Sequence, residues 1–232
     1  MTRQEPMRVL CLAPHCDDET LGCGGTLARL VAEGHDVRVA VVTGHGDDAP
    51  HPLWPREAWT TVRAECQAAM DALGVKRLRF GELPAALLAT VPTHVKNRAL
   101  HAIMQEARPE VLYVPFAYDL HVDHREVFAA ASVAWRPCSE LGRGIKEIYA
   151  YETASETHWN AGGLEPGFVP NTWVDVSATL KTKMTALAHY QSQLQPFPNA
   201  RSLEAVEHQA RWRGSQVGVA AAEAFVLVRK LM

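Results

Sequence analysis

Short apolar runs recur along the chain, and most of them are followed by a segment with helical spacing. Apolar side chains at nearly every position of a run indicate a strand that is buried on both faces, as in a parallel sheet. By this pattern strands are predicted at 8–13, 36–43, 77–80, 111–115, 145–151 and 224–229. Helical spacing predicts helices after Gly25, with Gly34 ending the first, and over 56–73, 92–107, 123–135, 178–194 and 203–213.

The alternation of strand and helix predicts an α/β fold, in which helices cover both faces of a mostly parallel sheet. The segment 152–172 is rich in Gly and Pro and is predicted to be a long loop. No repeat, low-complexity tract or linker interrupts the chain. We therefore expect a single three-layer, Rossmann-like domain that spans residues 1–232.

The run Gly22-Cys23-Gly24-Gly25 does not form the GxGxxG pattern of a dinucleotide-binding loop, and no acidic residue ends the second predicted strand. We expect these glycines to allow close packing of a helix on the sheet. A nucleotide cofactor is therefore not expected.

Composition and charge exclude several classes of partner. The 232 residues carry a formal net charge of -3, and charges of both signs are spread along the chain. No basic block suggests binding to nucleic acid or to an anionic membrane. The longest apolar runs are too short to span a bilayer. A small molecule is therefore the expected partner.

The N-terminal segment and the cysteines indicate the cellular compartment of the protein. The segment MTRQEPMRVLCLAPH lacks an apolar core followed by a small-residue cleavage site, so we do not expect a signal peptide. The five cysteines are odd in number and include no CxxC pair, which argues against a disulfide framework or a thiolate zinc ribbon. We expect a cytoplasmic protein.

Two clusters of chemically active side chains stand where predicted strands end. His15-Cys16-Asp17-Asp18-Glu19 follows the strand at 8–13, and His121-Val122-Asp123-His124 follows the strand at 111–115. In an open parallel sheet, ligands bind at the carboxyl ends of strands, near the point where the strand order reverses. The two clusters could thus face each other across one cleft. The loop His45-Gly46-Asp47-Asp48 either lines the same cleft or forms a solvated turn.

The clusters contain the groups that metal-assisted hydrolysis needs. A catalytic zinc site uses three protein ligands and leaves one position for water, whose pKa the metal lowers to about 7. A carboxylate then accepts the proton of the water, and a donor stabilises the oxyanion and protonates the leaving group. An alternative is that the carboxylates only stabilise helix N-termini, as Asp17, Glu19 and Asp123 could do. Spacing alone leaves both interpretations open.

The segment APHCDDETLGCGGTLARL resembles the first signature of the PIG-L/LmbE family of zinc-dependent N-acetylglucosaminyl de-N-acetylases, which usually reads His-Pro-Asp-Asp-Glu. HVDHREV resembles the second signature, His-x-Asp-His, and RAECQAAMDALGV at 63–75 resembles the intervening helix. The later segments YETASETHW, FVPNTWVDVS and KMTALAHYQSQ are similar to those of bacterial members. The resemblance thus covers nearly the whole chain.

The resemblance implies a metal site in which His15, Asp18 and His124 are the ligands. Zn²⁺ is the expected metal, and Fe²⁺ is compatible with the same ligand set. Cys16 departs from the family pattern, which usually has Pro at this position. It is either a small tolerated replacement or a thiol that touches the metal or makes the site sensitive to oxidation.

The resemblance also implies catalytic roles. Asp17 matches the general base, and His121 matches the residue that stabilises the oxyanion and donates a proton to the departing amine. Asp123 would orient His121. Arg63 matches an arginine that lies near the substrate in the family, although an exposed helical arginine would look the same. Asn171 is a further candidate for contact with the substrate.

The implied function is that of a metal-dependent hydrolase, which removes the N-acetyl group from an N-acetylated amino sugar or glycoconjugate. Two alternatives remain: a metal-dependent amidase for another acyl group or a non-sugar amine, and a non-catalytic binding protein. Members of the family act on lipid-linked, inositol-linked, malate-linked, antibiotic-linked and free amino sugars, so the sequence does not choose the substrate. Relatives are often trimers or hexamers, which leaves a homo-oligomer open.

Overall fold

The computed structural model describes residues 5–45 and 51–232. Residues 1–4 of the polar N-terminal segment lie outside the described residues, and so do residues 46–50, which include most of the predicted turn after His45. Within the two described ranges, no helix is long and apolar enough to cross a membrane.

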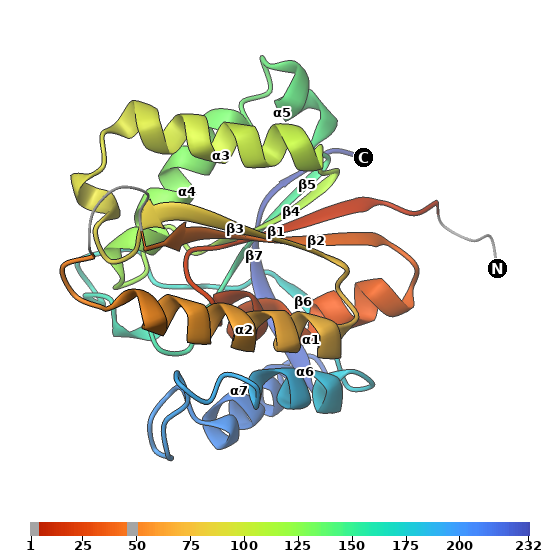
Figure 1. Ribbon diagram of the computed structural model, residues 1–232. Helices are drawn as coiled ribbons and strands as arrows, with labels where there is room; N and C mark the ends of the chain where they lie inside the picture. The colour runs from red at the N-terminus through yellow and green to blue at the C-terminus, as the bar shows by residue number, and fades with distance from the viewer. Residues whose placement is uncertain (1–4, 46–50) are drawn as a thin grey trace.

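A seven-stranded sheet forms the middle of the molecule (Figure 1). Its strands are β1 (Arg8–Ala13), β2 (Asp36–Gly44), β3 (Arg77–Pro84), β4 (Val111–Pro115), β5 (Glu147–Tyr151), β6 (Thr172–Asp175) and β7 (Ala222–Lys230). They lie in the order β3-β2-β1-β4-β5-β7-β6, and the first five of this order run parallel. β7 pairs antiparallel with both β5 and β6. The mostly parallel sheet that the sequence predicted is confirmed.

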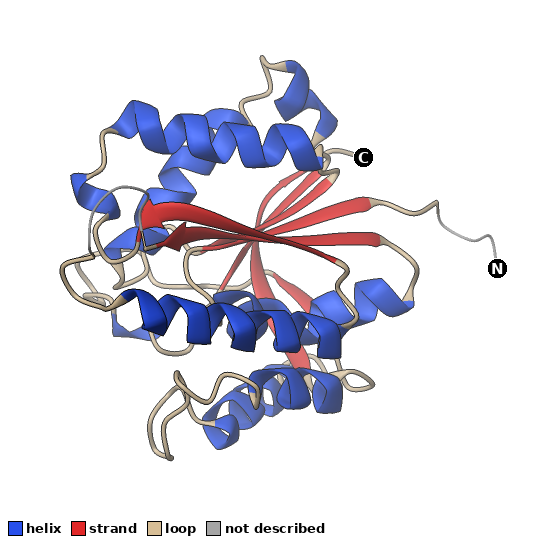
Figure 2. Ribbon diagram, viewed as in Figure 1, coloured by secondary structure: helices blue, strands red, loops and turns tan. Residues whose placement is uncertain are grey.

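Helices cover both faces of this sheet, as Figures 1 and 2 show. They are α1 (Asp18–Ala32), α2 (Arg56–Leu73), α3 (Thr93–Ala107), α4 (Val122–Ala134), α5 (Glu140–Gly144), α6 (Leu180–Leu187) and α7 (Leu203–Ser215), with short 3-10 helices η1 (Leu88–Thr90) and η2 (Thr157–Trp159). α1 and α2 lie on one face, where α6 packs against both of them, and α3 and α4 lie on the other. The predicted three-layer α/β fold is therefore confirmed.

β1 is a central strand, and its sequence explains why. It pairs with β2 on one side and with β4 on the other. Val9 and Cys11 pack into the core on the side of α1 and α2, whereas Leu10 and Leu12 pack into the core on the side of α3 and α4. Because side chains alternate between the faces of a strand, the unbroken apolar run 9–13 fits a strand covered on both faces.

The strand order reverses between β1 and β4, and this reversal positions the site. β1 leads into α1 on one face of the sheet, and β4 leads into α4 on the other. The loops after the two strands therefore diverge, which opens a crevice at the carboxyl ends of the strands. Both His/Asp clusters of the sequence begin in these loops.

α6 is shorter than the helix predicted over 178–194, because tertiary contacts redirect the chain after its eighth residue. The Tyr190 hydroxyl donates to the buried carboxylate of Glu19. The backbone N–H of Ser192 donates to Glu65 on α2 at 2.8 Å. Helical spacing cannot reveal contacts of this kind, since the partners are remote in sequence.

β6 lies at the end of the predicted loop 152–172 and was not predicted as a strand. None of its four residues is buried, so no apolar run marks it. It is recognisable only from its pairing with β7, in which Trp173 lies opposite Ala224.

Gly22, Gly24 and Gly25 lie inside α1. The sequence analysis had predicted that the helix begins only after them. Glycine lowers helix propensity, but close packing requires it here. A Cβ atom on Gly22 would stand 2.4 Å from Cδ2 of Tyr151, and one on Gly25 would stand 2.8 Å from Cβ of Val176. Gly22 thus lets α1 approach β5 closely, as expected from the sequence, whereas Gly25 admits the segment between β6 and α6.

Replacing Gly22 by Ala should lower the free energy of unfolding by about 1–3 kcal/mol, since the added methyl group has to displace the Tyr151 ring. That ring is held by its hydroxyl, which donates to the carbonyl of Leu12 at 2.9 Å. Denaturant unfolding measures the change. Gly162→Ala is the matched control, because a Cβ atom there meets nothing within 4 Å. Equal stability of the two variants would contradict the packing argument.

Candidate metal centre and catalytic site

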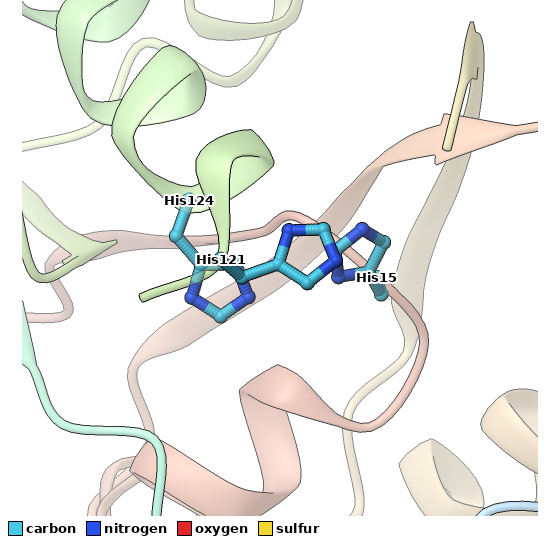
Figure 3. A group of neighbouring side chains, drawn as sticks. All are labelled: His15, His121 and His124. Atoms are coloured by element: carbon cyan, nitrogen blue, oxygen red, sulfur yellow. The ribbon is translucent and has the colours of Figure 1, made fainter. Parts of the chain in front are cut away.

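Three histidines from the two clusters meet at the carboxyl ends of β1 and β4 (Figure 3). His15 comes from the loop after β1, and His121 and His124 come from the start of α4. The ring centroid of His15 lies 4.5 Å from that of His121 and 5.5 Å from that of His124. One nitrogen of each ring lies within 4.8 Å of the others, so the two clusters share one site that is suitable for a metal ion.

Asp18 places a carboxylate between two of these rings. Its Oδ2 atom lies 3.3 Å from Nδ1 of His15 and 3.3 Å from Nε2 of His124. Ligand atoms held tetrahedrally at about 2.0–2.1 Å from zinc stand roughly 3.3 Å apart, so this spacing fits a zinc ion. Nε2 of His124 is buried and makes no hydrogen bond to any described residue.

Two further carboxylates contact the outer nitrogens of the same rings. Oδ2 of Asp123 lies 2.9 Å from Nε2 of His15, and Oδ2 of Asp119 lies 2.7 Å from Nδ1 of His124. Because an ionised carboxylate only accepts hydrogen bonds, these outer nitrogens carry the ring protons. The inner nitrogens point toward Oδ2 of Asp18, so a second ring proton or a metal ion has to lie between each of them and this carboxylate.

Electrostatics favour positive charge at this point. Burial opposes the charged form of His15, but hydrogen bonds to Asp123 and Asp18 outweigh it and raise the pKa of the ring to about 9. Burial likewise opposes charge on His124, but Asp18 and Asp119 raise the pKa of this ring to about 10. Both rings are therefore strong donors toward a cation.

Asp119 was not singled out in the sequence. Its side chain is fully buried in the loop between β4 and α4. An aspartate five residues before a candidate ligand does not match a known metal-binding motif. The only available signal was its place after a strand that leads into the second cluster, and the structure was needed to show its contact with His124.

His121 stands beside the cluster with its ring held in one tautomer. It is the N-cap of α4, and its Nδ1 accepts the backbone N–H of Asp123 at 3.2 Å. The neutral ring then carries its proton on Nε2. Burial, together with the neighbouring His15 and His124, lowers the pKa of His121 to about 4, which keeps the ring neutral.

The contacts of Asp123 differ from the role that the sequence implied. Its backbone N–H, and not its carboxylate, orients His121. The carboxylate contacts His15 and also accepts the backbone N–H groups of Ala86 at 2.5 Å and Leu88 at 3.1 Å. Asp123 therefore ties the ring of His15 to the segment that follows β3.

Asp17 is adjacent to Asp18 but has different surroundings. Its carboxylate is buried, makes no capping hydrogen bond to α1 and lines a cavity. Burial, followed by the charges of Asp18 and Glu19, raises the pKa of Asp17 well above its usual range. Its backbone φ is 118°, which residues other than glycine rarely adopt. Strain of this kind costs on the order of 1–3 kcal/mol and clusters at functional sites.

The cavity beside these groups has a volume of about 270 Å³. Small-molecule sites usually have roughly 300–1,000 Å³, so it suits a small ligand or one part of a larger ligand. Besides the two clusters, its lining includes the aromatic Trp54 and Trp59 and the polar Ser155, Glu156, Gln193 and Arg201. These polar residues lie in the C-terminal third of the chain, where sequence patterns were weakest.

The sequence profile of the PIG-L family, described as GlcNAc-PI de-N-acetylase, matches residues 10–135, which contain both clusters. The chain belongs to the PIG-L family. The 1D-myo-inositol 2-acetamido-2-deoxy-α-D-glucopyranoside deacetylase of Actinosynnema mirum is 31% identical to it, over 84% of this chain and 83% of that protein. The diacetylchitobiose deacetylase of Thermococcus kodakarensis is 28% identical, over 80% of this chain and 70% of that protein.

Proteins that are named for a different reaction share this fold. The structure of GalB, the 4-carboxy-2-hydroxymuconate hydratase of Pseudomonas putida, matches with a TM-score of 0.77. The match covers 97% of this chain and 98% of that one, at 18% identity. At this identity the likeness shows the fold alone. The reaction of this PIG-L protein therefore has to be argued from its site.

The two predicted substrate residues do not line the cavity. Arg63 donates to the carbonyl of Gly81 at 3.0 Å and to the carboxylate of Glu82 at 2.7 Å. The side-chain oxygen of Asn171 accepts the backbone N–H of Leu227 at 2.7 Å. Both side chains thus have structural partners, and their contact with a substrate stays a prediction.

Cys16, which departs from the PIG-L pattern, lines the cavity, but its thiol forms a hydrogen bond with Cys66. This hydrogen bond and burial raise the pKa of Cys16 well above its usual range. Metal binding and oxidation require the thiolate, which this environment disfavours. The surroundings of Cys16 thus favour a tolerated replacement over a reactive thiol.

Removing the Asp119 carboxylate should weaken zinc binding about 10- to 100-fold, because the ring of His124 loses the acceptor that fixes its orientation and tautomer. The zinc affinity of Asp119→Ala is measured by competition with a chelating dye. Asp71→Ala, at an exposed carboxylate on α2, is the matched control. The same affinity in both variants would contradict a supporting role for Asp119.

Proposed function

We propose that this chain is a zinc-dependent hydrolase that removes the acetyl group from the nitrogen of an N-acetylated amino sugar or glycoconjugate. One observation carries the proposal: Oδ2 of Asp18 meets the inner nitrogens of His15 and His124, beside the buried carboxylate of Asp17. Membership of the PIG-L family and the two deacetylase relatives support the same reaction.

His15, Asp18 and His124 are the proposed metal ligands. Two imidazoles and one carboxylate suit zinc, and ferrous iron is compatible with the same set. When bound, the metal supplies a Lewis acid for the acetyl carbonyl and lowers the pKa of water. Asp123 and Asp119 orient the two rings and make them stronger donors.

Asp17 is the proposed general base. Its carboxylate lines the cavity next to the proposed ligand Asp18 and does not cap the helix. A raised pKa makes the carboxylate a stronger base, so it accepts a proton more readily at neutral pH. One carboxylate of the pair thus offsets the charge of the metal, while its neighbour takes the proton of the attacking water.

His121 is the proposed donor to the oxyanion. Its ring lines the cavity, is neutral and carries its proton on Nε2, which suits a hydrogen bond to negative charge that develops on the carbonyl oxygen. A neutral imidazole is a weak acid. The proton that Asp17 has accepted from water is therefore the better source for the departing amine.

Two alternatives have weaker support. A metal-dependent amidase for another acyl group or a non-sugar amine would use the same centre, but both deacetylase relatives act on acetylated amino sugars by their names. A non-catalytic binding protein would have no use for a strained, buried carboxylate at Asp17. The single domain, the cytoplasmic location and a trimeric or hexameric assembly stay predictions.

Replacing Asp17 by Asn should lower turnover at least about 100-fold while zinc stays bound, because the base is lost and the three ligands remain. Asn tolerates positive φ about as well as Asp, so the loop keeps its shape. Release of free amine from N-acetylated sugars measures turnover, and the zinc content is measured on the same samples. Asp71→Asn on α2 is the control.

Full activity in zinc-loaded Asp17→Asn would remove Asp17 from the mechanism. Loss of zinc together with activity would assign Asp17 to metal binding instead.

A further inference from the structure

The cavity contains one fixed positive charge that the proposed reaction does not use. Its lining includes three carboxylates, Asp17, Asp18 and Glu156, and one guanidinium, that of Arg201. Within the described part of the chain, Arg201 makes no ion pair. It is only half-buried, so its head group is partly accessible from the cavity.

The half-buried Arg125 and the buried Arg213 are both engaged. Arg125 donates to both oxygens of Glu165 at 2.6 Å, and Arg213 donates to both oxygens of Glu152. These pairs have the bidentate geometry that a guanidinium favours with carboxylates. Arg201 has the same donors, but no carboxylate of the described residues contacts them. Its guanidinium is therefore available to bind an anionic ligand.

The backbone around Arg201 is held in place, so the guanidinium is presented from a fixed base. The carbonyl of Arg201 accepts the N–H of Gln195 at 3.2 Å, and the N–H of Arg201 donates to the side chain of Asn199 at 2.8 Å. The next residue, Ser202, caps α7 by accepting the N–H of Ala205 at 3.1 Å. A short closed loop thus leads directly into a capped helix.

The start of the same segment is fixed to α2. Both the N–H and the hydroxyl of Ser192 donate to the carboxylate of Glu65, at 2.8 and 2.5 Å. The adjacent Gln193 also lines the cavity. The segment 192–202 is therefore anchored at both ends and brings two polar side chains to the ligand. Preorganisation of this kind reduces the entropy lost on binding.

We propose that Arg201 is a specificity-determining residue, which binds a carboxylate or phosphate group on the substrate. The preferred substrate is then an N-acetylated amino sugar that carries an anionic group, and not a neutral sugar. This inference rests on the proposed function. The competing explanation is that Arg201 only offsets the charges of Asp17 and Glu156, in which case it treats neutral and anionic sugars alike.

The test compares neutral and anionic sugars on the zinc-loaded full chain. The neutral substrate is N-acetylglucosamine. Its 1-phosphate and 6-phosphate, together with N-acetylmuramic acid, place a phosphate or a carboxylate at three positions of the ring. The variants are Arg201→Gln, Arg201→Lys and the control Arg211→Gln, which removes an exposed arginine of α7 that pairs with Glu207. Both kcat/KM and the dissociation constant by calorimetry are measured.

We expect at least one anionic sugar to bind more tightly and to be cleaved with a higher kcat/KM than the neutral sugar. In Arg201→Gln the ratio of kcat/KM for that sugar to kcat/KM for the neutral one should fall about 10- to 100-fold, mainly through KM. Arg201→Lys should keep part of the preference, since it retains the charge but not the two parallel donors. Arg211→Gln should leave the ratio unchanged.

The inference is overturned if no anionic sugar binds more tightly than N-acetylglucosamine, or if Arg201→Gln weakens both kinds of sugar equally. The calorimetry separates this result from failure of the proposed function. Binding that prefers one anionic sugar and depends on Arg201, without release of acetate from any sugar, would support the role of Arg201 and contradict the deacetylase. The better of the phosphate and carboxylate sugars identifies the anion.

Discussion

The parallel pairing of β1 with β4 is the contact on which the candidate site depends. It brings together two segments that are far apart in the chain, with Cys11 opposite Tyr113 in the shared register. Since α1 and α4 then leave on opposite faces of the sheet, the loops before them diverge. Asp18 at the start of α1 and His124 in the first turn of α4 both line the cavity. His15 and His124 meet for this reason, and a shift in the register would separate them.

The buried carboxylates impose the second constraint. Asp18, Asp119 and Asp123 are almost fully buried around His15 and His124. Burying several negative charges together costs free energy unless positive charge compensates them. The same carboxylates raise the pKa values of both rings, so the cluster attracts positive charge, and a divalent cation between the inner nitrogens and Asp18 would supply it. In the proposed mechanism Asp17 stays outside the ligand set and takes the proton of the attacking water.

The sequence predicted the layers of the fold and the two clusters, because both depend on local patterns. Apolar runs such as 8–13 mark buried strands, and the strand ends mark where ligands bind. Contacts between remote residues were not predictable in this way. The support of His124 by Asp119 and the arrival of Arg201 at the cavity both require segments to be brought together by the fold. The early end of α6 has the same origin, since Tyr190 turns toward Glu19.

The most direct test of this account is a crystal structure of the zinc-loaded protein, with the metal located by anomalous scattering at the zinc edge. We predict one zinc ion bound by Nδ1 of His15, Oδ2 of Asp18 and Nε2 of His124, with Asp17 and His121 near the metal but not bound to it. The nearest rival arrangement is the cluster of three histidines, His15, His121 and His124. Zinc bound by His121 in place of Asp18 would contradict the proposed ligand set and the role of His121 as a donor.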